Sequence, residues 1–174
     1  MKAIRLVLAA AALVALAGGL TIGSASGARS DSKRFEAQFQ ESPVLRTDRV
    51  ADLGIFQLIN TGTGTVEGFG PATMVLAMSQ DRSVTPCGPG SWTNAGIRRI
   101  VVAAGVLILR EKAYVCQTEA GPVATGTWRV DGQASTGVFA GARGSGTDTV
   151  HIPTARSSLS GKLKLARPDW GEDG

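Results

Sequence analysis

The sequence is poor in the side chains from which most metal and catalytic sites are built. Its 174 residues include one His and two Cys, so we expect no metal site and no cofactor. Charged residues make up 18%, against an ordinary share of roughly 25%. This excludes a long charged coiled coil and a typical disordered tail protein. Glycine is abundant instead, with 23 positions, but it has no three-residue period, which excludes collagen.

The one long apolar run lies at the N-terminus and has the form of a secretory signal. Lys2 and Arg5 precede the uninterrupted run Leu6–Ala17, and small residues then lead to Ser26-Gly27-Ala28, which a signal peptidase accepts. We expect cleavage after Ala28, with Ala25 as the second choice. The competing interpretation is an uncleaved membrane anchor, because an apolar run of about 17 residues is at the lower limit for crossing a bilayer.

Loss of the signal makes the chain nearly neutral. Lys2 and Arg5 leave with it, so 16 basic and 14 acidic side chains remain, a net charge of +2. The basic residues are scattered singly or in pairs, with no stripe and no interleaved aromatics. We therefore expect a secreted or cell-envelope protein with no nucleic-acid partner and no stable membrane insertion after cleavage.

Cysteine usage fits export. Cys87 and Cys116 predict a single disulfide in a secreted chain. The bond would close a loop of about 30 residues, worth on the order of 3–4 kcal/mol in the chain-entropy description. A redox pair or a metal site is the alternative, but the chain has no C-x-x-C pattern and a single His.

Past the signal, the chain shows the two-residue period of β-strands and no sustained helical period. The clearest case is Leu159–Leu165, where leucine and glycine alternate with serine and lysine. We predict about eight strands in a barrel domain over Ala51–Ala166, with Arg29–Val50 as a flexible polar leader and Arg167–Gly174 as a polar tail. A short extra strand or arm within the leader is the alternative, because Phe35, Ala37 and Phe39 alternate with polar residues. The other predicted strands are Leu53–Ile59, Gly62–Gly70, Ala72–Met78, Ile97–Ala103, Val106–Cys116, Ala124–Val130 and Gly144–Ile152.

The fold class predicted is all-β, and an antiparallel barrel is favoured over a sandwich. Ala104-Gly105 between two apolar runs indicates a hairpin, and the glycines within strands suit tight bends at barrel corners. An immunoglobulin-like sandwich would place a buried Trp in a strand between the two cysteines. Here Trp92 lies between the cysteines, but in the Gly/Pro loop that begins right after Cys87, so the sandwich is the weaker alternative.

Two glycine-rich motifs resemble a known family. Gly126–Gly132 and Phe139–Thr147 are similar to the paired motifs of the allene oxide cyclase barrel-like, or dirigent-like, secreted bacterial proteins, and Gly62–Gly70 is similar to their first glycine-rich strand. The resemblance covers roughly Leu53–Leu165. One departure is the turn Gly132–Phe139, which is longer than the family's usual turn and lacks its Arg, so no role of that Arg is carried over.

The resemblance implies an eight-stranded antiparallel barrel with an apolar lumen. Plant members of the family include a cyclase of a lipid-derived epoxide and proteins that steer phenol coupling. Three functions follow as alternatives: binding of a small apolar molecule in the lumen, an isomerase or cyclase acting on an apolar substrate, and a non-catalytic structural or interaction module with a filled lumen. A cavity of roughly 300 Å³ or more with a polar group inside would favour a ligand.

Candidate catalytic residues are few. His151 is the only imidazole and precedes Ile152-Pro153 at a predicted strand end, which is more typical of a rim or surface position. Glu67 shares a face with Thr63 and Thr65; pointing inward, it would be a carboxyl group in an apolar cavity, suited to acid or base catalysis. Because Val66 between small residues indicates the inner face, we expect Glu67 to point outward.

Candidate ligand-binding residues lie on two predicted strands. Arg110-Glu111-Lys112 follows an apolar run, which suggests that the strand leaves the core there and forms a rim where Arg110 could meet a polar ligand end. Tyr114 and Trp128 could line a pocket, although filling of the core is the default expectation for such residues.

Overall fold

A computed structural model describes residues 32–50 and 55–166, and within them the fold is all-β, with no α-helix. The predicted signal peptide and polar tail lie outside the described residues. Within the described part, no helix is long and apolar enough to cross a membrane. The strands, with their bounds, are β1 (Lys33–Val50), β2 (Ile55–Val66), β3 (Gly70–Asp81), β4 (Trp92–Val102), β5 (Gly105–Thr118), β6 (Gly121–Val130), β7 (Thr136–Gly137), β8 (Arg143–His151) and β9 (Arg156–Lys164), with a single-turn 3-10 helix η2 (Ile152–Thr154) between the last two.

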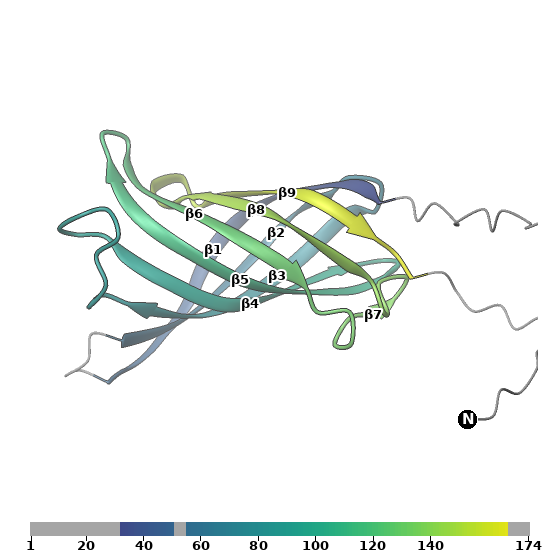
Figure 1. Cartoon of the computed structure of the whole chain (residues 1–174), viewed down its shortest axis with the longest axis horizontal. Helices are drawn as coiled ribbons and strands as arrows, with labels where there is room; N and C mark the ends of the chain where they lie inside the picture. Colours follow the sequence, from purple (N-terminus) through teal and green to yellow (C-terminus); the bar gives the residue numbers. More distant parts are fainter. Residues whose placement is uncertain (1–31, 51–54, 167–174) are drawn as a thin grey trace, which may run out of the picture.

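Eight of these strands close into an antiparallel barrel, as predicted. The order around the wall is β1-β2-β3-β4-β5-β6-β8-β9, and β9 pairs back with β1. The two-residue strand β7 lies outside the ring and pairs only with the start of β5. Figure 1 shows the strands crossing the barrel obliquely, as closure of a sheet requires.

Most of the segment predicted as a flexible leader is a strand of the wall, so the leader prediction was wrong for these residues and the alternative of an extra strand is confirmed. Lys33–Val50 is β1, which pairs with β2 on one side and β9 on the other. Phe35, Ala37 and Phe39 point into the core and are at most 3% exposed. Arg34, Glu36, Gln38 and Gln40, which suggested a leader, alternate with these residues on the outward side of the strand. Pro43 fits because the β1–β2 register shifts directly after it.

Two segments predicted as separate strands form one. Leu53–Ile59 and Gly62–Gly70 were expected as distinct elements, but β2 runs without interruption from Ile55 to Val66. The total of eight therefore results from merging these two and adding β1. The predicted β4–β5 hairpin is confirmed, with its turn at Ala103-Ala104 and Gly105 opening β5 at a φ of +149°.

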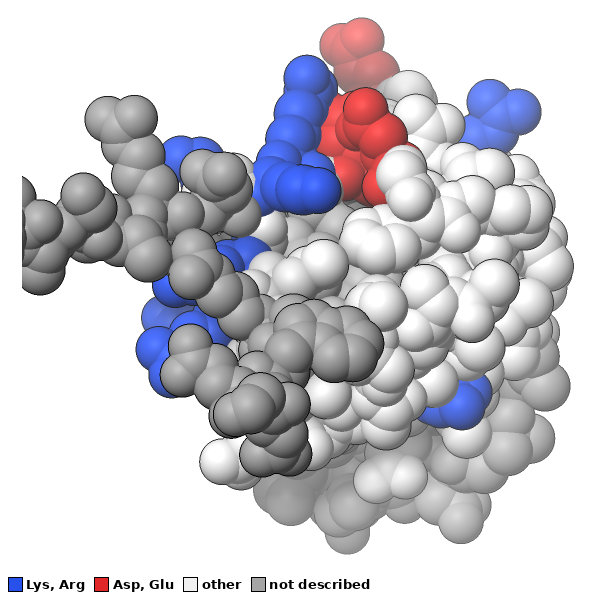
Figure 2. Space-filling model, turned by 90° about the vertical axis from the view of Figure 1, so that its right-hand side faces the viewer, with Lys and Arg blue, Asp and Glu red and all other residues white. Residues whose placement is uncertain are grey.

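One half of the lumen is filled by side chains. This is the end that carries the β2–β3 and β4–β5 turns, on the right in Figure 1. Seen end-on in Figure 2, the part not covered by grey atoms is a continuous and largely uncharged surface. The buried apolar side chains that fill this half of the lumen include Phe35, Phe39, Val66, Met74, Ile100, Leu107, Leu109, Trp128, Phe139, Leu159 and Leu163.

Glycines in this half make room for an aromatic ring. Gly146 and Gly161 face each other across β8 and β9, and a Cβ on either would lie 2.5–2.6 Å from the Trp128 ring. Trp128 is 1% exposed, packs edge-to-face on Phe35 with ring centroids 5.2 Å apart, and donates its indole N–H to the Thr147 carbonyl at 3.0 Å. These two glycines therefore serve close packing inside the barrel.

The predicted disulfide between Cys87 and Cys116 is confirmed. It joins the β3–β4 connection to β5, with Cα atoms 5.6 Å apart at a sequence separation of 29. Cys87 lies in a short irregular loop, where its N–H donates a hydrogen bond to the Ser91 hydroxyl at 3.1 Å. The bond fixes this loop to the wall at the end of the barrel opposite the filled core.

Candidate functional site

The inward faces of four strands each place one charged residue at the middle of the barrel. Glu41 continues the inward series of β1, Arg98 that of β4, Glu111 that of β5 and Asp148 that of β8. All four side chains are at most 6% exposed. Because every other residue of a strand faces the same side, closure of the ring brings these charges together at the border of the filled half.

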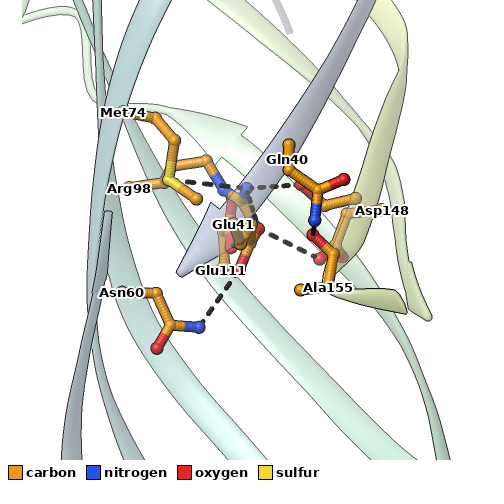
Figure 3. Close-up of polar contacts among 9 residues, drawn as sticks. Gln40, Glu41, Asn60, Met74, Arg98, Glu111, Asp148 and Ala155 are labelled. Carbon is orange, nitrogen blue, oxygen red and sulfur yellow. Dashed lines mark hydrogen bonds and ion pairs between the residues drawn. The ribbon is translucent and has the colours of Figure 1, made fainter. Parts of the chain in front are cut away.

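Arg98 is the centre of this ion cluster. Its Nε and Nη2 donate to the two carboxylate oxygens of Glu111 at 2.6 and 3.2 Å, and its Nη1 donates to Glu41 at 2.9 Å and to the Ser157 hydroxyl at 3.3 Å. Figure 3 shows these contacts converging on the guanidinium. Burial alone would lower the pKa of Arg98, but the carboxylates of Glu111 and Glu41 raise it, so the guanidinium stays charged.

Asp148 is held less completely than the two glutamates. Its Oδ2 lies 3.8 Å from Nη2 of Arg98, and its Oδ1 has no hydrogen-bond partner. Burial, then the nearby carboxylate of Glu111, raises the pKa of Asp148 to about 7, which the Arg98 guanidinium only partly opposes. Glu41, in contrast, also accepts a bond from the Asn60 amide at 3.1 Å. Asp148 is therefore the acid of the cluster that titrates near neutral pH.

A cavity of about 240 Å³ lies next to the ion cluster, on the side away from the filled core. Its floor is the charged group Glu41, Arg98, Glu111 and Asp148. Its walls are mostly apolar, and the strand ends and η2 contribute its outer part. The principal lining residues of the walls and outer part are Leu58, Leu76, Met78, Ala113, Ala124, Val150, Gln80, Trp92, Asn94 and Ile152.

Three buried polar atoms without a hydrogen-bond partner belong to residues that line this cavity. They are Oδ1 of Asp148, Oδ1 of Asn94 and Nε1 of Trp92. A buried polar atom left unpaired costs about 1–3 kcal/mol, and most native polar groups avoid it. Two acceptors and one donor therefore lie unsatisfied in residues around a single cavity. This pattern is typical of a ligand-free binding site, in which the bound molecule would supply the missing hydrogen bonds.

The two candidate catalytic residues lie outside this cavity. Glu67 is exposed in the β2–β3 turn, next to the buried Val66, as the outward orientation requires. His151 is exposed at the end of β8. Neither is among the residues that line the cavity, so the structure does not bring them together, and a catalytic role for either stays a prediction.

The three candidate ligand-binding residues do not line the cavity either. Trp128 is in the filled core, Tyr114 is 46% exposed on the outer face, and Arg110 points outward to an ion pair with Asp131 at 2.6 Å. The expectation that the strand leaves the core at Arg110 was wrong. Glu111 points inward beside it, and Val115 further along β5 is fully buried.

Sequence reasoning missed the four residues of the ion cluster. A signal was present, because each occupies an inward position in its strand: Glu41 in phase with Phe39, Arg98 with Ile100 and Glu111 with Leu109. A charge on an apolar face of a strand is uncommon unless it is paired. The sequence analysis instead took the Glu111 segment as a strand leaving the core, placed Glu41 in a leader, and did not single out Arg98 or Asp148 within their predicted strands.

No protein-family model matches this chain, and a search of curated proteins finds no significant match. The site's chemistry therefore has to be read from its own residues. Within residues 32–50 and 55–166, no group of three or more His, Cys, Asp or Glu side chains is arranged to hold a metal ion. The carboxylates are spread around the Arg98 guanidinium instead of facing a common point.

Proposed function

We propose that this protein is a binding barrel for a small molecule, which occupies the open half of the lumen with its apolar part against the walls and a polar group on the ion cluster. The observation that carries the proposal is the coincidence of a cavity of about 240 Å³ with three unpartnered buried polar atoms. The volume is below the roughly 300 Å³ stated above as favouring a ligand, so the proposal rests on the unpartnered polar atoms and is limited to a small molecule.

The filled half of the barrel supports this proposal more than a purely structural role. A structural module gains most by packing its whole lumen with apolar side chains, since a cavity destabilises a core in proportion to its volume. Here tight packing ends at the ion cluster and the space beyond it is left open. A cavity and buried charges both cost stability, so their presence together favours a role in recognition.

A cyclase or isomerase of the allene oxide cyclase-like type is the second candidate, favoured by Asp148. A carboxyl group in a largely apolar cavity, with a pKa of about 7, suits proton transfer at neutral pH. Activity on an apolar substrate that is lost in Asp148→Asn and retained in Glu67→Gln would establish this function over binding alone. The eight-stranded closed barrel is compatible with the proposed family relationship.

An extracellular location is part of the proposal. It rests on the signal-like N-terminus and on the disulfide between Cys87 and Cys116, a bond that persists in oxidising compartments. The same location would expose the barrel to small molecules outside the cell.

The experiment is a mass-spectrometric search for small molecules that co-purify with the exported protein. It compares the wild type with Ala124→Phe, which fills the cavity, and with Ala77→Phe, which adds the same ring to an exposed position on β3. We expect a compound in the wild type and Ala77→Phe and at least a roughly tenfold loss in Ala124→Phe, because a phenyl ring takes up much of the space.

Circular dichroism and thermal unfolding verify that both variants fold. An equal amount of the compound in folded Ala124→Phe would place binding elsewhere and contradict the proposal. The absence of any compound from the wild type, together with failure to bind the probes described below, would also contradict it.

A further inference from the structure

The charge balance on the cavity floor points to a particular class of ligand, on the premise that the open half of the lumen is a binding site as proposed above. One guanidinium faces three carboxyl groups. The cluster therefore holds more acidic groups than its one guanidinium can balance. Buried charges without a counter-charge are strongly unfavourable, so the floor favours an additional cation.

Arg98 has little left to offer an anionic ligand. Its donors are directed to Glu111 twice, to Glu41 and to Ser157, and Asp148 lies at its remaining side. A ligand carboxylate or phosphate would compete with those acceptors and would face three carboxyl groups at close range. The floor is therefore an acceptor surface, although a guanidinium stands at its centre.

The unpartnered acceptors lie on one row across the wall. The strand register aligns Asn94 of β4 with Ala113 of β5, Ala113 with Gly126 of β6, and Gly126 with Asp148 of β8. The two middle residues are the smallest available, and a Cβ on Gly126 would lie 2.3 Å from Oδ1 of Asp148. The row thus places two unpaired oxygens at the ends of a stretch with no bulky side chain between them.

We propose that the cavity selects a small organic cation, an ammonium group on an apolar body, with the ammonium donating to Asp148 and balancing the floor. A primary ammonium provides three donors and a positive charge, which matches the acceptors and the sign of the deficit. The walls of Leu58, Leu76 and Met78 receive the apolar body. Since a benzene molecule fits a cavity of about 150 Å³, an aromatic ring with a short amine arm fits the volume here.

The charged surroundings of Asp148 agree with this assignment. The groups that face it are Arg98 from β4, Glu111 from β5 and Glu41 from β1, while its neighbours on β6 and β9 are Gly126 and Leu159. The one cation near the outer part of the cavity, among the described contacts of its lining residues, is Arg82, which stacks on the Trp92 ring at 5.0 Å. Arg82 is exposed, so solvent and salt screen its repulsion.

The test uses three probes of nearly equal size: 2-phenylethylamine, 2-phenylethanol and phenylacetate. Calorimetric titration at about pH 8.5, where the amine is still protonated and Asp148 is largely ionised, measures each affinity for the full exported chain. We expect the amine to bind at least about tenfold more tightly than the alcohol, and phenylacetate to bind more weakly than both, because only the ammonium adds a counter-charge.

Two variants locate the effect. In Asp148→Asn the preference for the amine over the alcohol should fall at least about tenfold, while affinity for the alcohol changes less than about twofold. The matched control, Glu119→Gln, removes an exposed carboxylate from the β5–β6 turn and should leave all three affinities unchanged. The probe comparison on the wild type needs no variant, so a misfolded Asp148→Asn would not prevent the test.

The outcomes separate the two proposals. If the alcohol or phenylacetate binds as tightly as the amine, the inference of a cationic ligand is overturned while the binding function stands. If a neutral or anionic compound co-purifies and the amine does not bind, the inference of a cationic ligand is likewise overturned and the binding function stands. If no probe binds and nothing co-purifies, both proposals are overturned.

Discussion

Asp148 differs from the other acids of the lumen in what its two oxygens contact. One lies 3.8 Å from the Arg98 guanidinium and the other has no hydrogen-bond partner, whereas both oxygens of Glu111 accept bonds from Arg98. Burial therefore raises the pKa of Asp148 to about 7. A group whose pKa is higher in the folded state than in the unfolded state makes stability depend on pH.

Between about pH 4 and pH 7, the folded protein keeps a proton on Asp148 that the unfolded chain has released. The free energy of unfolding should therefore decrease as the pH rises through this window, by up to about 4 kcal/mol. Asp148→Asn should lose this dependence. Denaturant unfolding of both proteins at several pH values measures it.

Asp131 is the control for this experiment. The hydrogen bond from Arg110 lowers the pKa of the Asp131 carboxyl, so its contribution is present at neutral pH and is lost only as the pH falls below about 4. Asp131→Asn should keep the wild-type slope between pH 4 and pH 7. A slope that persists in Asp148→Asn would assign the titration to another group.

At the scale of the element, β1 decides whether the barrel closes. It is the only strand that joins β2 to β9 in the described structure, and it carries Glu41 of the ion cluster. Its backbone is tied to the β8–β9 connection as well, since the Glu41 N–H donates to the Ala155 carbonyl at 2.7 Å. A leader without structure would contribute neither a wall nor a charge.

The role of β1 can be tested with two neighbouring positions. Phe39→Ala removes an inward side chain that is 3% exposed and should lower the free energy of unfolding by about 3–5 kcal/mol. Gln38→Ala changes an exposed position on the same strand and should alter it by less than about 0.5 kcal/mol. Chemical denaturation measures both. Equal and small effects would show that the segment does not belong to the barrel in solution.

At the scale of the whole molecule, the barrel has one closed and one open half. Apolar side chains fill the end with the β2–β3 turn, and the ion cluster separates that core from the cavity. The disulfide lies at the open end, where it holds the loop that leads directly into Trp92 of β4. Covalent support is therefore placed at the end of the barrel that contains the cavity.

Replacing both cysteines should destabilise the protein without removing the fold. Cys87→Ser combined with Cys116→Ser removes the bond that closes a loop with a sequence separation of 29. We expect a loss of about 2–4 kcal/mol in the free energy of unfolding. Thermal unfolding of the wild type with and without reductant, compared with the double variant, measures this. A reductant that lowers the stability of the double variant too would indicate a cause other than the bond.

The amino-acid sequence by itself determined the local features of this protein. The two-residue period of segments such as Leu159–Leu165 defined strands, because backbone geometry alone sends alternate side chains to opposite faces. The β4–β5 hairpin and the only possible cysteine pair were likewise predictable from the sequence, since neither depends on distant parts of the chain.

Only the tertiary structure decided which inward residues meet. Arg98 contacts Glu41 and Asp148, which are far away in sequence, because ring closure and register bring β1, β4 and β8 around one lumen. The alternating pattern predicts that a side chain points inward. It does not predict the position of that side chain along the barrel axis or the strands that lie next to it, because both depend on register. The filled half, the cavity and its acidic floor all follow from that register, which no single segment specifies.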